Sequence, residues 1–182
     1  MTDLRAASDK FRFGKVARGL HWGMAVLLLG MVGWGFYAAH LNFYDPLYHR
    51  ALSWHRSMGV LLFGVLLFRI VWRLGQQPAP LPDPMPIWEK QAAHVTHWAL
   101  YLCMFLLPAT GYAVSTADGR GVNVFGLWEL PAWLPPDRGR ETWMGTLHLA
   151  VAILFCLLVF MHVAAAFKHH FINRDGILRR MW

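Results

Sequence analysis

Two histidines lie in an otherwise apolar stretch near the C-terminal end of the sequence. His148 and His162 interrupt the segment TLHLAVAILFCLLVFMHV, which contains no Asp, Glu, Lys or Arg. They are 14 residues apart, which in a helix is close to four turns and about 21 Å of rise. Both imidazoles are therefore expected on one face of a helix, near its two ends. Neutral imidazole is the commonest metal ligand among side chains, so this spacing predicts two separate metal-binding positions.

The elements that position these histidines are expected to be membrane helices. Three runs contain no acidic or basic residue and exceed the roughly 20 residues that cross a bilayer: residues 19–44, 91–117 and 142–167. A fourth run, 52–74, carries Arg56, Arg69 and Arg73 near its ends, where long side chains can snorkel to the headgroups. We predict an all-α integral membrane bundle of four helices in a single domain, over residues 16–39, 51–74, 89–114 and 142–170.

The composition supports a membrane protein, because 57% of the residues are hydrophobic and only 15% are charged, too few to cover a soluble domain. Of the 17 Lys and Arg residues, all but five fall in the N-terminal arm, the Pro-rich connection QQPAPLPDPMP with its flanks, and the C-terminal tail. The positive-inside rule then predicts that both termini are cytoplasmic. The net charge of +7 therefore needs no nucleic acid to explain it. A cleavable signal peptide is not expected, because the first apolar stretch is too long.

The antiparallel order of the helices pairs the histidines by depth. His21 and His162 are expected near the cytoplasmic surface, and His55 and His148 near the outer surface. Two facing imidazoles at each of two depths are what two six-coordinate b haems require. Small residues lie three or four positions from three of these histidines, leaving room for a flat ring: Gly59, Gly145, Ala165 and Ala166. Four arginines lie near the same depths and can meet haem propionates: Arg18, Arg50, Arg56 and Arg140.

The histidines have other interpretations besides haem ligation. A single intramembrane histidine can be a hydrogen-bonding contact between helices. A proton relay or a metal transporter predicts acidic or thiolate partners, and the spans lack carboxylates, while Cys103 and Cys156 form no metal-binding spacing. His94 and His97 are expected to bond a propionate or to line a quinone pocket, with axial ligation as the alternative.

Five segments resemble the bacterial cytochrome b561 family, which is related more distantly to the cytochrome b subunits of nickel–iron hydrogenases. They are ARGLHWGMAVLLL, SWHRSMGVLLFGVLLFRIVWRL, AAHVTHWALYLCMFLLPATGY, GTLHLAVA and FMHVAAAFKHHF, and the resemblance runs from about residue 13 to 180. It implies a four-helix protein of the bacterial inner membrane with two b haems. Its haem ligands fall on His21, His55, His148 and His162, in agreement with the pairing by depth.

The resemblance also implies a superoxide:ubiquinone oxidoreductase, which takes electrons from superoxide at the periplasmic face and passes them to ubiquinone. Lys168 and His169, in the motif FKHHF, are then candidates for the quinone site. Five outer arginines would attract the superoxide anion: Arg50, Arg56, Arg120, Arg138 and Arg140. The alternative is a quinol-oxidising electron carrier, or a cytochrome b anchor, that delivers electrons to a partner redox protein docked on the long outer connection, residues 115–141.

Overall fold

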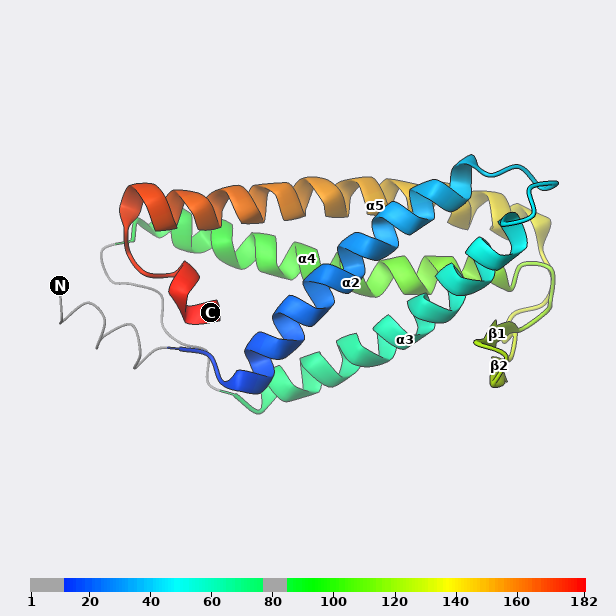
Figure 1. Cartoon of the computed structure of the whole chain (residues 1–182), viewed down its shortest axis with the longest axis horizontal. Helices are drawn as coiled ribbons and strands as arrows, with labels where there is room; N and C mark the ends of the chain where they lie inside the picture. Colours follow the sequence, from blue (N-terminus) through cyan, green and yellow to red (C-terminus); the bar gives the residue numbers. More distant parts are fainter. Residues whose placement is uncertain (1–11, 77–84) are drawn as a thin grey trace.

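A computed structural model describes residues 12–76 and 85–182. In these residues four helices are long and apolar enough to cross a membrane: α2 (Lys15–His40), α3 (Tyr48–Leu74), α4 (Ile87–Ser115) and α5 (Arg138–Phe167). They run up and down side by side (Figure 1). The predicted four-helix membrane bundle is thereby confirmed. Arg5, Lys10 and most of the Pro-rich connection lie outside the described residues.

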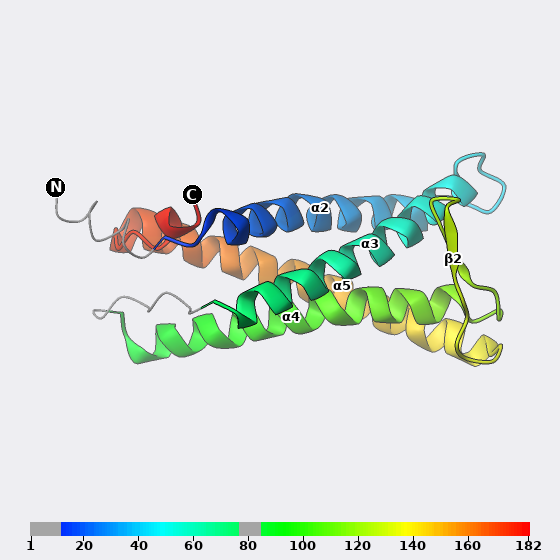
Figure 2. The ribbon, with the colours of Figure 1, turned by 90° about the horizontal axis from the view of Figure 1, so that it is seen from below.

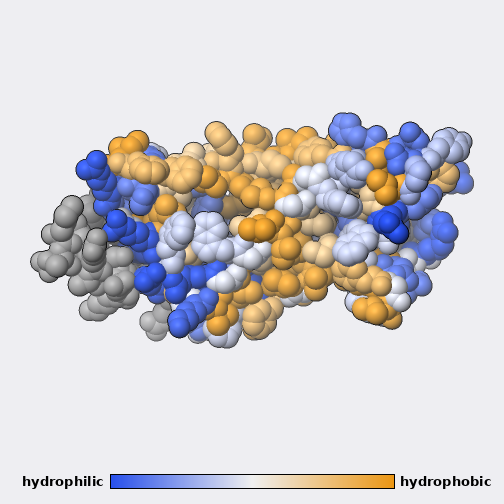
Figure 3. Space-filling view, viewed as in Figure 1, coloured by the Kyte–Doolittle hydropathy of each residue, from blue (hydrophilic) through white to orange (hydrophobic). Residues whose placement is uncertain are grey.

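The bundle exposes its apolar side chains instead of burying them. Large hydrophobic residues on the helix surfaces, such as Val26 and Leu157, are more than half exposed. Figure 3 shows hydrophobic residues over the middle of the molecule and hydrophilic residues at its two ends. A belt of this kind is stable against lipid tails and not against water. We call the end at which Phe13 and Trp182 lie the inner end, and the opposite end the outer end.

The helices pack unevenly. The closest packing is between α4 and α5, around buried Cys103, Val151 and Phe155. Helix α3 leaves α2 at the outer end and runs obliquely toward α4 (Figure 2). The backbone of α5, by contrast, approaches α2 and α3 closely at few points or none. Side chains of α5 that reach those two helices must therefore span open space between the backbones.

Two helix ends differ from the predicted ones. Helix α5 begins at Arg138 and not near residue 142, because the side chain of Asp137 caps it by accepting from the backbone N–H groups of Gly139 and Arg140. The uncharged run marks the membrane span, and the helix extends beyond it. At its other end α5 continues as a π-helix, η1 (Lys168–Asn173), which stops at Arg174 in a left-handed conformation with φ 54°. Helix α4 contains Pro108 in its interior and continues to Ser115.

The long outer connection contains a hairpin that was not predicted, formed by β1 (Val122–Val124) and β2 (Trp128–Leu130). Its turn holds Phe125 and Gly126 at positive φ, as tight hairpin turns require. Ser57, only 1% exposed, fixes it to the outer end of α3. The Ser57 hydroxyl donates to the carbonyl of Asn123 and accepts from the N–H of Phe125. The hairpin therefore lies over the outer end of α3, where its anchor Ser57 is two residues from His55 in the sequence.

The C-terminal tail folds back onto the start of α2. It contains a short helix, η2 (Leu178–Met181). The indole N–H of Trp22 donates to the carbonyl of Met181 at 2.7 Å, and the guanidinium of Arg18 donates to the carbonyl of Trp182. These contacts join the two ends of the described chain at the inner end of the bundle.

Candidate functional site

The four histidines paired by depth lie in two facing pairs. In the outer pair, the ring centroids of His55 on α3 and His148 on α5 are 6.2 Å apart. In the inner pair, those of His21 on α2 and His162 on α5 are 6.3 Å apart. Helix α5 contributes one histidine to each pair, and these side chains extend across the open space beside its backbone. The structure thus brings together the residues that the sequence predicted to meet.

The spacing within each pair suits a metal atom between the rings. Two imidazoles on opposite sides of one metal have centroids roughly 6.3 Å apart, since each metal–nitrogen bond is about 2.0 Å and each nitrogen lies about 1.15 Å from its ring centroid. A direct hydrogen bond between two imidazoles would bring the centroids to roughly 5.2 Å. The observed 6.2 and 6.3 Å match the first arrangement and exceed the second by about 1 Å. The residues therefore fit axial coordination of haem iron.

The surroundings of His148 fix which of its nitrogens is free. The Nδ1 atom of His148 lies 3.0 Å from the hydroxyl of Thr110, and that hydroxyl donates to the carbonyl of Leu106 at 2.7 Å. A hydroxyl that donates elsewhere can accept the Nδ1–H of a neutral imidazole. The Nε2 lone pair is then left for a metal, as in metal sites in which a partner orients the ligating histidine. Thr110 is 4% exposed, so this contact is shielded from water.

Glycines on neighbouring helices leave room for the outer rings. A Cβ on Gly35 would lie 2.9 Å from Cε1 of His55, and a Cβ on Gly111 would lie 3.2 Å from Cε1 of His148. No side chain could stand at Gly35 without displacing the imidazole. Gly59 and Gly145, the glycines expected from the sequence to make room for a ring, have no atom within 4 Å of an added Cβ. They border open space, which a flat macrocycle can use.

The inner pair has two further neighbours. Arg69 places a guanidinium nitrogen 3.4 Å from Nδ1 of His21 and donates from Nε to the hydroxyl of Tyr101 at 3.1 Å. The ring of His97 lies 5.4 Å from that of His162. His97 is thus beside the inner pair, whereas His94, on the same helix, is exposed. Arg69 was noticed in the sequence only for its place near the end of a span.

The arginines expected near the haem propionates have different surroundings. Arg18, Arg56 and Arg140 each bury an Nε atom that has no hydrogen-bond partner in the described part of the chain. Arg18 is also held by the carbonyl of Trp182, and Arg140 donates to the carbonyl of Thr116 at 3.1 Å. Arg50 is exposed. Buried, unpartnered guanidinium nitrogens require an acceptor, and a carboxylate is the strongest one available.

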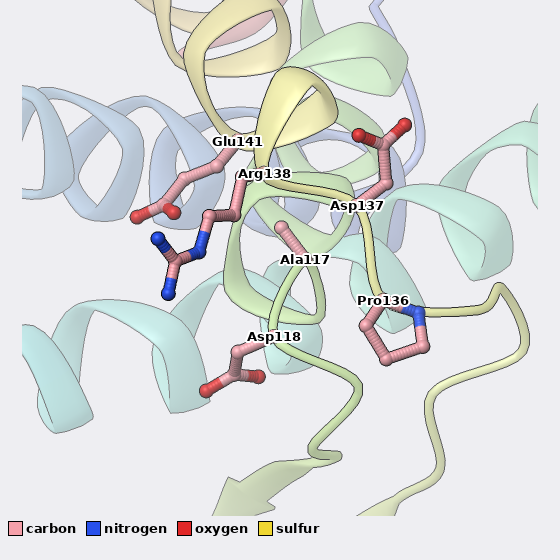
Figure 4. A pocket seen from close by; sticks show the side chains of 6 residues that line it. All are labelled: Ala117, Asp118, Pro136, Asp137, Arg138 and Glu141. Carbon is pink, nitrogen blue, oxygen red and sulfur yellow. The ribbon is translucent and has the colours of Figure 1, made fainter.

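The outer surface is not uniformly positive. Arg120 forms an ion pair with Asp118 at 2.7 Å, and the backbone and side-chain hydrogen bonds of Arg120 lower the pKa of that carboxyl. A hollow of about 600 Å³ next to it is lined by Ala117, Asp118, Pro136, Asp137, Arg138 and Glu141. Figure 4 shows the Arg138 and Glu141 side chains close together on one side of this hollow. Its carboxylates make it unsuited to an anion, so of the outer arginines Arg56 and Arg140 remain the best placed to attract one.

At the inner end, Lys168 and His169 both contact carboxylates. The ammonium of Lys168 lies 2.5 Å from Glu89 Oε1. His169 Nδ1 lies 2.5 Å from Asp175 Oδ2, and its Nε2 lies 3.6 Å from Glu89 Oε2. The sequence reasoning missed Glu89 and Asp175. A signal was available for Glu89, which lies eight residues before His97 and so on the same face of α4.

Replacement of Thr110 by valine is expected to weaken cofactor binding at the outer pair. Valine keeps the shape but leaves His148 Nδ1 without its acceptor, and loss of such a partner typically costs 10–100-fold in affinity at metal sites (about 1.4–3 kcal/mol). Haem titration of the apoprotein, followed in the Soret band, measures this. Thr96→Val, the same change elsewhere on α4, is the control. Equal haem affinity in Thr110→Val and the unsubstituted protein would contradict the role of Thr110.

Two comparisons with known proteins agree on the kind of protein that this chain resembles. Residues 12–182 match the family model described as "Prokaryotic cytochrome b561". The chain is 39% identical over 171 residues to "Cytochrome b561 homolog 2" of Escherichia coli (strain K12), covering 93% of this chain and 90% of the relative. It is 29% identical over 168 residues to "Probable superoxide oxidase CybB" of Yersinia pestis, with 90% and 91% covered. It is 25% identical over 174 residues to "Cytochrome b561 homolog 1" of the same Escherichia coli strain, with 93% and 96% covered.

Proposed function

Because the chain belongs to the prokaryotic cytochrome b561 family, we propose that it binds two b haems and passes electrons from superoxide at the periplasmic face to ubiquinone in the membrane. Membership itself, with the four membrane-spanning helices, makes it a multi-pass protein of the bacterial inner membrane. It also makes it a haem b protein of electron transport. The number of haems, the ligands, the substrates and the cytoplasmic position of both termini are parts of the proposal.

The observation that carries the proposal is the spacing of the two histidine pairs, 6.2 and 6.3 Å between ring centroids, at opposite ends of the bundle. His55 and His148 would hold the outer haem, and His21 and His162 the inner one. When bound, haem b supplies reversible one-electron transfer. Arg56 and Arg140 would bind the outer propionates through their unpartnered nitrogens. Arg18, whose Nε is also unpartnered, would do the same at the inner pair, where Arg69 adds a second positive charge beside His21.

The reaction balances as two superoxide anions, one ubiquinone and two protons giving two O₂ and one ubiquinol. The chain contributes positive charge at the outer end, where superoxide would arrive, since Arg56 follows His55 directly and Arg140 lies in the first turn of α5. Attraction of this kind raises association rates most at low salt. The inner end must supply the two protons, because ubiquinone reduction takes up as many protons as electrons. A relative of this chain carries the printed name "Probable superoxide oxidase CybB", which supports the choice of donor.

The carboxylates around the outer hollow favour a second candidate. Asp118, Asp137 and Glu141 border it, and a surface of this charge suits a basic partner redox protein better than superoxide. In that case the protein would oxidise quinol and deliver electrons outward, as an electron carrier or a cytochrome b anchor. The two candidates differ in the direction of electron flow and in the substrate that reduces the protein.

Stopped-flow spectroscopy of the oxidised, haem-loaded protein separates the two candidates. Mixing with superoxide is expected to give the reduced haem bands within the dead time or shortly after it, and a ubiquinone analogue should then restore the oxidised bands. Added superoxide dismutase is the control and should abolish the reduction. Absence of reduction by superoxide, together with rapid reduction by a ubiquinol analogue, would contradict the superoxide reaction and establish the electron carrier.

A further inference from the structure

At the inner end, where α4 begins and α5 continues as η1, an imidazole lies between two carboxyl groups. His169 stands between two carboxylates, with Nδ1 2.5 Å from Asp175 and Nε2 3.6 Å from Glu89. The side chains of Glu89, His169 and Asp175 are 9%, 13% and 15% exposed. Such shielding is uncommon for three titratable groups in contact, and it requires a reason beyond solubility.

The reason is not a simple ion pair. Lys168 contacts only one oxygen of Glu89, at 2.5 Å, and is itself 41% exposed. The second oxygen, Oε2, is buried and has no hydrogen-bond partner within the described residues. A carboxylate that served only to tie α4 to α5 would gain by pairing both oxygens, since an unsatisfied buried acceptor is destabilising. Glu89 Oε2, which lies 3.6 Å from His169 Nε2 without a hydrogen bond, therefore points to a further partner.

The backbone of η1 makes the contact between His169 and Asp175. A π-helix is wider than an α-helix, and short π segments occur often at functional sites. The widened turn and the left-handed Arg174 bring Asp175 back over His169, six residues earlier. The amide of Asn173 also lies 3.1 Å from Nδ1 of His169. The imidazole is thus held with one nitrogen toward the tail and the other toward α4.

Sequence spacing places the cluster about two helical turns from the inner histidine pair. His169 follows His162 by seven residues, and Glu89 precedes His97 by eight. These spacings are about two helical turns, so each residue lies on the same helix face as the histidine and roughly 10–12 Å from it along the axis. Within the cluster, Glu89 is less exposed than Asp175. Helices α4 and α5 both run from the cluster to the inner histidine pair.

We propose that Asp175, His169 and Glu89 form the proton relay that supplies the quinone reduced at the inner end, with Glu89 as the terminal donor. The inference rests on the proposed function. A proton taken from the aqueous side by Asp175 moves to His169 Nδ1, the opposite nitrogen releases a proton to Glu89, and Glu89 passes it to a quinone oxygen. Imidazole can do this because one nitrogen accepts while the other donates. The gap of 3.6 Å closes with a small side-chain rotation or one bridging water.

Lys168 and His169 thereby receive roles different from those expected from the sequence. Both were predicted as direct contacts of the quinone. In the relay, His169 carries the proton and Lys168 holds the other oxygen of Glu89, so the residue that meets the quinone is Glu89. Two protons pass for each quinone reduced, which matches the two electrons that it accepts.

The test compares two electron acceptors on the pre-reduced, haem-loaded protein. Reoxidation by a ubiquinone analogue takes up protons, whereas reoxidation by ferricyanide does not. Glu89→Gln keeps the shape but carries no proton, and we expect it to slow reoxidation by the quinone on the order of 100-fold. Ferricyanide should reoxidise it at the rate of the unsubstituted protein. Proton uptake, followed with a pH-indicator dye in weak buffer, should slow together with the quinone reaction.

Two further variants separate the relay from an ion pair. Lys168→Met breaks the ion pair but keeps the carboxyl, and we expect it to slow the quinone reaction by less than about fivefold, the effect of a partly exposed ion pair. Glu129→Gln, the same substitution in the exposed strand β2, should leave both reactions unchanged. If Glu89→Gln and Lys168→Met slow the quinone reaction equally, the contact is structural and the relay is wrong.

Three further outcomes would contradict the relay. Equal quinone rates in Glu89→Gln and the unsubstituted protein would overturn the relay and leave the proposed function intact. Slower reaction of Glu89→Gln with both acceptors would show damage to the inner redox centre and would likewise overturn it. If the unsubstituted protein does not reduce the ubiquinone analogue although ferricyanide reoxidises it, the proposed function fails and the relay fails with it, since no acceptor for its protons remains.

Discussion

Substitution of His148 by alanine is expected to halve the haem content of the purified protein, from two b haems per chain to one. Among the histidines that the structure describes, His148 faces His55, with ring centroids 6.2 Å apart. The inner pair lies about 21 Å away along α5, so loss of the outer ligand should leave it unchanged. A pyridine haemochrome assay measures the haem content, and a redox titration should show one component where the unsubstituted protein shows two.

His55→Ala, which removes the facing ligand, should give the same single-haem protein with the same remaining spectrum. The control is His49→Ala. This histidine is also near the outer end but is exposed and packs against Phe43, so both haems should remain. Retention of two haems by His148→Ala would refute the pairing. So would different spectra for the single haems left in His55→Ala and His148→Ala, because the two variants would then have lost different haems.

Hydropathy and residue spacing predicted those features of the site that are set by the position of a residue along its own helix. The uncharged runs predicted the spans, and the antiparallel order then placed His21 at the depth of His162 and His55 at the depth of His148. These pairs could be predicted because the bilayer fixes the depth of each residue in a membrane helix, although it does not fix the rotation of the helix. The resemblance to the bacterial cytochrome b561 family, read from the motifs around these histidines, is confirmed by the match over residues 12–182.

Features that depend on the rotation of one helix against another could not be predicted. Gly35 and Gly111 approach His55 and His148 from other helices, and nothing in the sequence around either glycine indicates which ring it faces. Thr110 was not among the predicted site residues, although its hydroxyl lies beside His148. The contact of His169 with Asp175 depends on a π-helical turn, which has no sequence pattern distinct from an α-helix.

Other misses came from reading hydropathy as if it were helix length. Asp137 is a common type of helix-capping residue, and it places the start of α5 at Arg138, outside the uncharged run. The hairpin of β1 and β2 has strands of only three residues each, too short for an alternating pattern to stand out. Its place is fixed by Ser57, a residue that lies 66 positions earlier than Asn123 and carries no signal of its own.

These contacts show that each helix contributes different residues to the site. Helix α5 provides one histidine to each pair, while α2 and α3 provide one each, and α4 places Thr110 and Gly111 beside His148. Because α4 packs closely along α5, it can hold the α5 histidines in place while the backbones of α2 and α3 stay at a distance.

Replacement of Gly35 by leucine is expected to remove the outer haem while the inner one remains. The Cβ alone would lie 2.9 Å from Cε1 of His55, closer than carbon atoms can approach, so the imidazole must shift. The remaining carbons of leucine reach further toward the ring, and we expect them to turn the imidazole away from His148. Gly33→Leu is the matched control, since no atom lies within 4 Å of a Cβ at that position on the same helix. Both variants add the same apolar volume to α2, so a general effect on the bundle would appear in both.

Gly35→Ala gives a graded version of the same test. Its single added carbon can be relieved by a shift of a few tenths of an ångström in the His55 ring, so we expect this variant to retain both haems with a weaker outer site, by about 10-fold in haem affinity, as for other losses of ligand orientation. Low-temperature spectra and redox titration should show a change in one haem component only. Equal haem content in Gly35→Leu and Gly33→Leu would show that haem binding does not depend on the position of the His55 ring beside Gly35, and would contradict the role of His55 as a haem ligand.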